Sequence, residues 1–128
     1  MSKRILIIED QEDNRQIIHD VLGANGYESL EAISGEEGLT IAAREKPDLI
    51  LMDIQLPGMD GRTALGELRK DPATVRIPVI AVTASVMPIE RKEILAAGFD
   101  GYQAKPLSVK DLLAEVRHVL DRAAESHT

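Results

Sequence analysis

Polar side chains that could bind a metal ion or a phosphoryl group stand at the ends of four short segments that could form strands. Glu9 and Asp10 follow the first segment, Asp53 the second, Thr83 the third and Lys105 the last. If the segments are parallel strands, these side chains converge at one edge of a sheet, where three carboxylates repel one another. A hard divalent cation with oxygen ligands would offset this repulsion, and Lys105 would be a second counterion. The pattern predicts a Mg²⁺ site, with Mn²⁺ as an alternative ion.

Each of these residues also has a purely structural interpretation. Acidic residues after strands often cap the following helix, and Asp10 is placed to cap one that begins near Glu12. Thr83 is a good strand former, and Lys105 taken alone is a solvated surface charge. The coincidence of all of them at successive strand ends is what favours a functional site.

The segments that must position these residues have the pattern of buried strands. Continuous apolar runs are typical of central strands covered on both faces. The three runs of this kind are Ile5–Ile8, Leu49–Met52 and Val79–Val82. Weaker strands are predicted for residues 29–33 and 100–104.

Stretches with helical spacing separate the predicted strands. In the first, Ile17, Ile18, Val21 and Leu22 fall on one face, which predicts an amphipathic helix. Strands that alternate with helices imply an α/β fold: a parallel sheet with right-handed crossovers and helices on both faces. Ligands of such sheets bind outside the carboxyl ends of the strands, where the polar residues stand.

Length and composition exclude several other classes of protein. The 128 residues fit one domain, which we assign to residues 1–122, followed by a frayed tail at 123–128. A net charge of −7 argues against binding a nucleic-acid backbone or an anionic membrane. The absence of cysteine excludes a thiolate zinc site and a cysteine nucleophile. The N-terminal apolar run is too short for a signal peptide or membrane span, so we expect a cytoplasmic protein.

Over nearly its whole length the chain resembles the receiver domain of two-component response regulators. Four dispersed elements carry the resemblance, in the order Glu9-Asp10, Asp53 to Gly61 (DIQLPGMDG), Val82-Thr83-Ala84 and Lys105-Pro106. Within the family the chain looks most like stand-alone cell-division regulators of the DivK type and the receivers of hybrid kinases. The resemblance implies a doubly wound five-stranded parallel sheet of flavodoxin-like order 2-1-3-4-5, flanked by five helices.

The resemblance also implies roles for the residues at the strand ends. Asp53 would accept a phosphoryl group. Asp10, Asp53 and the backbone carbonyl of Gln55 would ligate Mg²⁺, and Glu9 would act through a water molecule. The acidic pair is Glu-Asp instead of the commoner Asp-Asp, and we expect metal binding to survive this difference.

Three further residues would convert phosphorylation into a signal. Lys105 would pair with a phosphoryl oxygen, and the Lys105-Pro106 peptide would be cis. The Thr83 hydroxyl would bond the phosphoryl group, and Tyr102 would rotate inward as Thr83 moves. The alternative for Tyr102 is that it simply covers the edge of the sheet.

The implied partners are a sensor histidine kinase or a histidine phosphotransfer protein upstream and an effector protein downstream, with no nucleic acid and no membrane. The same sequence could be a receiver domain cut from a hybrid histidine kinase. An aspartyl-nucleophile phosphatase is a third interpretation. Such phosphatases commonly carry a second Asp two residues after the nucleophile, and Gln55 at that position argues against a turnover enzyme.

Overall fold

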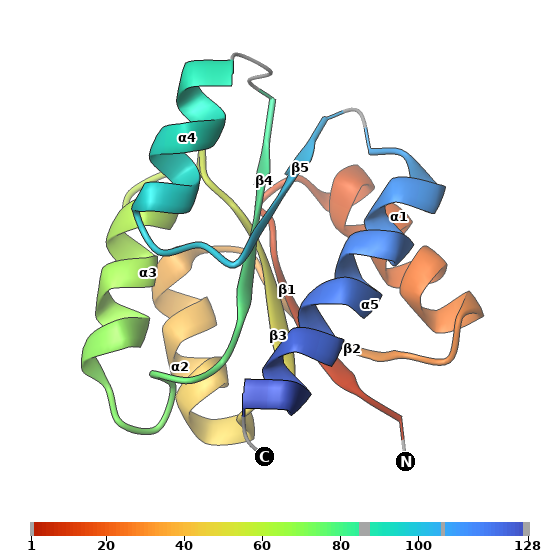
Figure 1. The fold of residues 1–128 in the computed structure, drawn as a ribbon, viewed down its shortest axis with the longest axis horizontal. Coiled ribbons are helices and arrows are strands. Elements are labelled where there is room, and N and C mark those ends of the chain that lie inside the picture. Colours follow the sequence, from red (N-terminus) through yellow and green to blue (C-terminus); the bar gives the residue numbers. More distant parts are fainter. Residues whose placement is uncertain (1, 85–87, 106, 127–128) are drawn as a thin grey trace.

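The structure is a computed structural model that describes residues 2–84, 88–105 and 107–126. Within these residues five strands alternate with five helices (Figure 1). In chain order they are β1 (Arg4–Ile8), α1 (Glu12–Ala24), β2 (Glu28–Ala32), α2 (Gly35–Glu45), β3 (Leu49–Asp53), α3 (Gly61–Lys70), β4 (Val79–Thr83), α4 (Pro88–Ala96), β5 (Gly101–Ala104) and α5 (Val109–Ser126). No helix among the described residues combines the length and apolar character needed to cross a bilayer.

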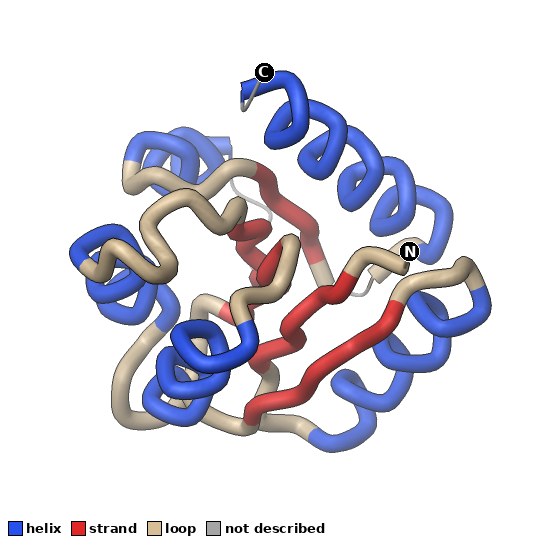
Figure 2. The backbone as a smooth tube through the Cα atoms, turned by 90° about the horizontal axis from the view of Figure 1, so that it is seen from below, coloured by secondary structure: helices blue, strands red, loops and turns tan. Residues whose placement is uncertain are grey.

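The strands form one parallel sheet in the order β2-β1-β3-β4-β5, as predicted (Figure 2). The chain moves from β1 outward to β2 and then returns to the other side of β1 to form β3. The strand order therefore reverses between β1 and β3. Sheets of this kind bind ligands at such a reversal, outside the carboxyl ends of the strands.

Side chains of the central strands alternate between two cores, which explains why these strands are apolar throughout. Leu6 and Ile8 of β1 pack with α2, α3 and α4 on one face, whereas Ile5 and Ile7 pack with α1 and α5 on the other. Figure 1 shows the same two layers of helices on either side of the sheet.

Several details of the elements differ from the sequence expectations. Ile17 is 54% exposed, whereas Ile18 and Leu22 are buried, because successive helical residues are separated by about 100° around the axis. Strand β2 starts and ends one position earlier than predicted, so Ile33 lies outside it and is exposed. Helix α5 continues through Ser126, past the expected domain boundary at residue 122.

Helix α3 begins directly beyond the loop that follows β3. Its N-cap is Asp60, whose carboxylate accepts a hydrogen bond of 2.8 Å from the Thr63 N–H. This backbone hydrogen bond, with a smaller contribution from the Thr63 side chain, lowers the pKa of Asp60. The ionised cap satisfies a helix N–H group that has no partner within the helix.

We predict that Asp60→Ala lowers the free energy of unfolding by about 1 kcal/mol, while Asp60→Asn retains most of it, because Asn caps helices nearly as well as Asp. Since the folded-state pKa of Asp60 is lowered, the advantage of Asp over Asn is present above the unfolded pKa and is lost as pH falls through the folded pKa. Urea denaturation at neutral and acidic pH measures both effects. Equal stability of the wild type and Asp60→Ala would contradict the prediction.

Candidate functional site

The predicted site residues meet at the carboxyl ends of the strands. Asp53 and Thr83 are the last residues of β3 and β4. The sequence analysis placed them directly after these strands, so each strand extends one residue further than predicted. Glu9 follows β1 directly, and its N–H donates to Ala32 O at 3.0 Å, so its backbone still pairs with β2. Glu9, Asp53 and Thr83 are 2%, 5% and 3% exposed, although polar residues of these types are usually at the surface.

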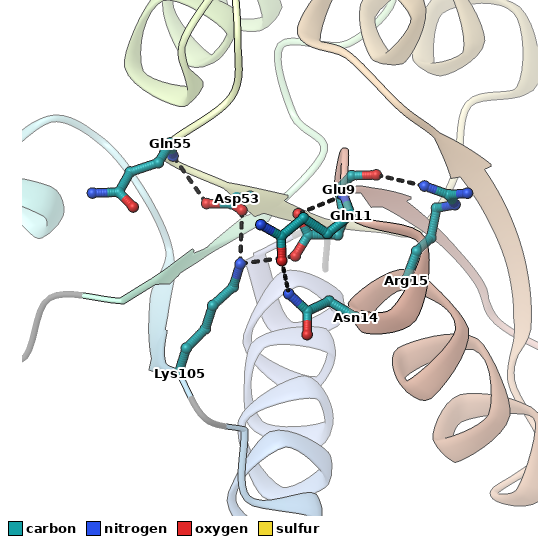
Figure 3. Close-up of polar contacts among 7 residues, drawn as sticks. All are labelled: Glu9, Gln11, Asn14, Arg15, Asp53, Gln55 and Lys105. Carbon is teal, nitrogen blue, oxygen red and sulfur yellow. Dashed lines mark hydrogen bonds and ion pairs between the residues drawn. The ribbon is translucent and has the colours of Figure 1, made fainter.

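One ammonium group joins two of the buried carboxylates. Lys105 Nζ donates to Glu9 Oε1 and to Asp53 Oδ2, each at 2.8 Å (Figure 3). Lys105 follows β5, so these two contacts tie the last strand of the sheet to β1 and β3. A buried ion pair with both partners hydrogen-bonded is held in one geometry, and removing either partner leaves an uncompensated charge.

The second oxygen of Asp53 is also held. Asp53 Oδ1 accepts a 2.9 Å hydrogen bond from the backbone N–H of Gln55, two residues further along the chain. Figure 3 shows Asp53 between Gln55 on one side and Lys105 on the other. With both oxygens bonded, the carboxylate has a defined orientation.

The charges of this cluster influence one another. Burial raises the pKa of the Glu9 carboxyl, and the neighbouring Asp53 acts in the same direction, whereas the hydrogen bond from Lys105 opposes both. Partial burial disfavours the charged form of Lys105, but its bonds to Asp53 and Glu9 outweigh this and raise its pKa. Lys105 is therefore a cation at neutral pH.

Asp10 completes a group of three carboxylates. Ligand atoms of Glu9, Asp10 and Asp53 all lie within 4.8 Å of one another. Three carboxylates and one ammonium leave a formal excess of two negative charges, and hard oxygen donors at this spacing suit Mg²⁺. The donor set thus fits a divalent cation.

The capping role considered for Asp10 is wrong. The N-cap of α1 is Gln11, and no side-chain hydrogen bond caps this end of the helix. Asp10 is exposed, so its carboxylate is accessible to a ligand.

Tyr102 lies on β5, half-buried against the core that faces α2, α3 and α4. The Arg91 guanidinium of α4 sits 5.0 Å from the centre of the Tyr102 ring, within the range of a cation–π contact.

Pro106 lies outside the described residues, so the predicted cis peptide between Lys105 and Pro106 stays a prediction.

Gly61 contributes to the site in a way that the sequence analysis did not identify. A Cβ at this position would lie 2.8 Å from Asp53 O and 2.7 Å from Ile54 Cα. The Gly61 N–H also donates to Ile54 O at 2.9 Å, which draws α3 against the end of β3. Only a residue without a side chain allows this approach to the backbone of Asp53.

Residues 5–117 match the family model of the response regulator receiver domain. The chain belongs to this family. The receiver domain is 40% identical over 123 residues to the polar-differentiation response regulator DivK of Brucella ovis, an alignment that covers 96% of this chain and all of DivK. It is 39% identical over the same length to DivK of Brucella anthropi.

Solved receiver structures have the same fold. The CheY-like response regulator receiver domain protein of Methanospirillum hungatei JF-1 is 32% identical, with a TM-score of 0.88 over 98% of this chain and 99% of that one. The receiver domain of sensor histidine kinase PA1611 from Pseudomonas aeruginosa PAO1 is 34% identical, with a TM-score of 0.81 over 95% and 97%. The receiver domain is thus similar both to a single-domain regulator and to the receiver of a kinase.

The role of Gly61 generates a prediction about stability. Gly61→Ala must displace the backbone at Asp53, so we expect a loss of about 1–3 kcal/mol of unfolding free energy. The matched control is Gly66→Ala in the same helix, where an added Cβ meets nothing within 4 Å and should stabilise by about 0.4–1 kcal/mol. Urea denaturation compares the two, and equal effects of both substitutions would contradict the role given to Gly61.

Proposed function

We propose that this receiver domain is a phosphorylation switch in which Asp53 accepts a phosphoryl group from a phosphohistidine. The donor is a sensor histidine kinase or a histidine phosphotransfer protein, and the phosphorylated domain binds an effector protein with altered affinity. The observation that carries the proposal is the buried Asp53 carboxylate, which Lys105 and the Gln55 N–H hold beside two further carboxylates.

Asp53 is the nucleophile. One of its oxygens attacks phosphorus and forms an acyl phosphate, while the P–N bond of the phosphohistidine breaks and its electron pair leaves with the imidazole nitrogen. A carboxylate can form an acyl phosphate without the general base that a hydroxyl nucleophile needs. The hydrogen bonds to its two oxygens hold it in one orientation for an in-line attack.

The chain's oxygen donors would hold Mg²⁺ at the same place. We assign Asp10, Asp53 and the backbone carbonyl of Gln55 as direct ligands and Glu9 as a ligand through water. When bound, the cation would supply positive charge to offset that of the transferring phosphoryl group. The related receiver domain of PA1611 has a magnesium ion coordinated in its active site cleft, which supports this choice of metal.

Lys105 changes partner during the reaction. Its ammonium bonds the Asp53 carboxylate before transfer, and the phosphoryl group added there carries about −1.5 to −2 charges. The raised pKa keeps Lys105 protonated, so it bonds a phosphoryl oxygen after transfer. Its bond to Glu9 holds the side chain at the site in both states.

Thr83 and Tyr102 transmit the change to the surface. Thr83 is buried at the end of β4 beside Asp53, and its hydroxyl donates to the phosphoryl group. A near-complete switch needs roughly 5.5 kcal/mol of differential stabilisation. A single charge-assisted hydrogen bond supplies about 1.5–3 kcal/mol, so Lys105, Thr83 and the metal must all contribute.

The effector surface is formed by α4, β5 and α5. A cleft of about 590 Å³ lies between these elements, with Tyr102 and the half-exposed Leu95 in its lining. Movement of Tyr102 would alter the shape of this cleft. The proposed switch applies equally to a free-standing regulator and to a receiver domain that is part of a hybrid histidine kinase.

The test is phosphorylation of the purified protein. Incubation with a phosphohistidine donor protein, and separately with acetyl phosphate, should add one phosphoryl group in the presence of Mg²⁺ and none in EDTA, as measured by intact mass. Asp53→Asn should gain nothing, whereas Asp48→Asn, at the opposite end of β3, should be modified like the wild type. Modification of Asp53→Asn, or an unmodified wild type with both donors, would refute the proposal.

A further inference from the structure

The turn between β1 and α1 carries the exposed metal ligand but lacks the usual helix cap. Gln11 is the N-cap residue of α1 and makes no side-chain cap bond, and the Gln11 N–H reaches Glu9 Oε2 only at 3.4 Å. Asp10 lies in this turn and is exposed. Another contact must fix the backbone of this turn if Asp10 is to be positioned before a cation binds.

Arg15 lies near the start of α1, and its side chain extends back to the segment between β1 and α1. Its Nη1 donates to the backbone carbonyl of Glu9 at 3.0 Å, and its Nε donates to Glu31 Oε1 of β2 at 3.2 Å. The Arg15 side chain is only 17% exposed although it carries a charge. Figure 3 shows Arg15 extending from α1 to the far side of Glu9 from Lys105.

The bond to the Glu9 carbonyl acts on Asp10 through the peptide plane. Glu9 C=O and Asp10 N–H belong to one planar unit, so holding this oxygen sets the direction in which the chain enters Asp10. The other polar groups of Glu9 are held too, its N–H by Ala32 O and its carboxylate by Lys105. Arg15 supplies the contact that fixes the outgoing peptide.

We propose that Arg15 is a positioning residue that presets the Glu9–Asp10 turn for binding of a divalent cation. The proposal rests on the proposed function, since it concerns the same metal site. Arg15 contacts the backbone of Glu9 and not the carboxylate cluster itself, and Glu31 orients its guanidinium. Groups that orient metal ligands typically change metal affinity by 10–100-fold when they are removed.

Charge and positioning predict opposite results for the loss of Arg15. If Arg15 acted only through its positive charge, its removal would lower the repulsion felt by a cation and strengthen Mg²⁺ binding. If Arg15 holds the turn, its removal weakens Mg²⁺ binding despite the lost repulsion. The sign of the change in affinity therefore separates the two.

The experiment measures the Mg²⁺ dissociation constant of the unphosphorylated protein by isothermal titration calorimetry, together with the urea unfolding midpoint of each variant. We expect Arg15→Met to weaken Mg²⁺ binding about tenfold. Arg15 makes its two contacts through separate nitrogens, Nε and Nη1, and the single ammonium of Arg15→Lys should replace only part of them. We therefore expect the Mg²⁺ affinity of Arg15→Lys to lie between those of the wild type and Arg15→Met. The conservative variant also serves if Arg15→Met folds poorly.

The matched control is Arg4→Met at the start of β1. Arg4 also bonds one backbone carbonyl and one carboxylate, Glu45 O at 2.9 Å and Glu45 Oε1 at 2.7 Å, but it lies at the opposite end of the strand. We expect Arg4→Met to lose stability while its Mg²⁺ affinity stays within about twofold of the wild type.

Three results would overturn the proposal. Mg²⁺ binding by Arg15→Met as tight as by the wild type, or tighter, would show that Arg15 does not position the turn. Equal weakening in Arg4→Met would show that general destabilisation is the cause. A wild-type protein that binds no Mg²⁺ would overturn the metal site of the proposed function and this inference with it.

Discussion

The arrangement of the site depends on two buried carboxylates that share one ammonium group. Glu9 and Asp53 lie at the ends of neighbouring strands, almost fully removed from water, and Lys105 bonds both at 2.8 Å. Burying like charges is costly, and a single Lys offsets only part of the cost once Asp10 is added. A bound divalent cation, or a change in the charges of the cluster, alters this electrostatic balance. The site therefore responds to a ligand.

The fold creates this constraint by its topology. Because the strands are parallel and β1 lies next to β3, Glu9 and Asp53 come together at one edge of the sheet. Lys105 follows β5, on the other side of β3 from β1, and its side chain reaches both carboxylates. The two aliphatic cores hold the strands so that their ends are fixed. Asp53 is therefore held at the last position of a strand and Glu9 by its backbone bond to β2, whereas Asp10 lies in the turn that follows.

Much of this could be predicted from the sequence, because strand ends and apolar runs are local signals. The runs beginning at Ile5, Leu49 and Val79 are continuous since both faces of the sheet are covered, and the polar residues that follow them are easily recognised. Ile17 was misplaced because neighbouring positions of a short apolar stripe are hard to tell apart. The roles of Gly61 and Arg15 depend on contacts between elements, which no local pattern reveals.

The most direct test of the excess negative charge at the strand ends is whether Mg²⁺ raises the free energy of unfolding. Urea unfolding at constant ionic strength, with Na⁺ replacing Mg²⁺, measures the free energy of unfolding of the wild type and of Asp10→Asn. Asp10 is exposed, so its replacement alters the metal site with little effect on packing. The wild type should gain about 2.7 kcal/mol at a Mg²⁺ concentration of 100 times the dissociation constant, and Asp10→Asn clearly less at the same concentration. A wild-type stability that does not change with Mg²⁺, or an equal gain in Asp10→Asn, would contradict the account.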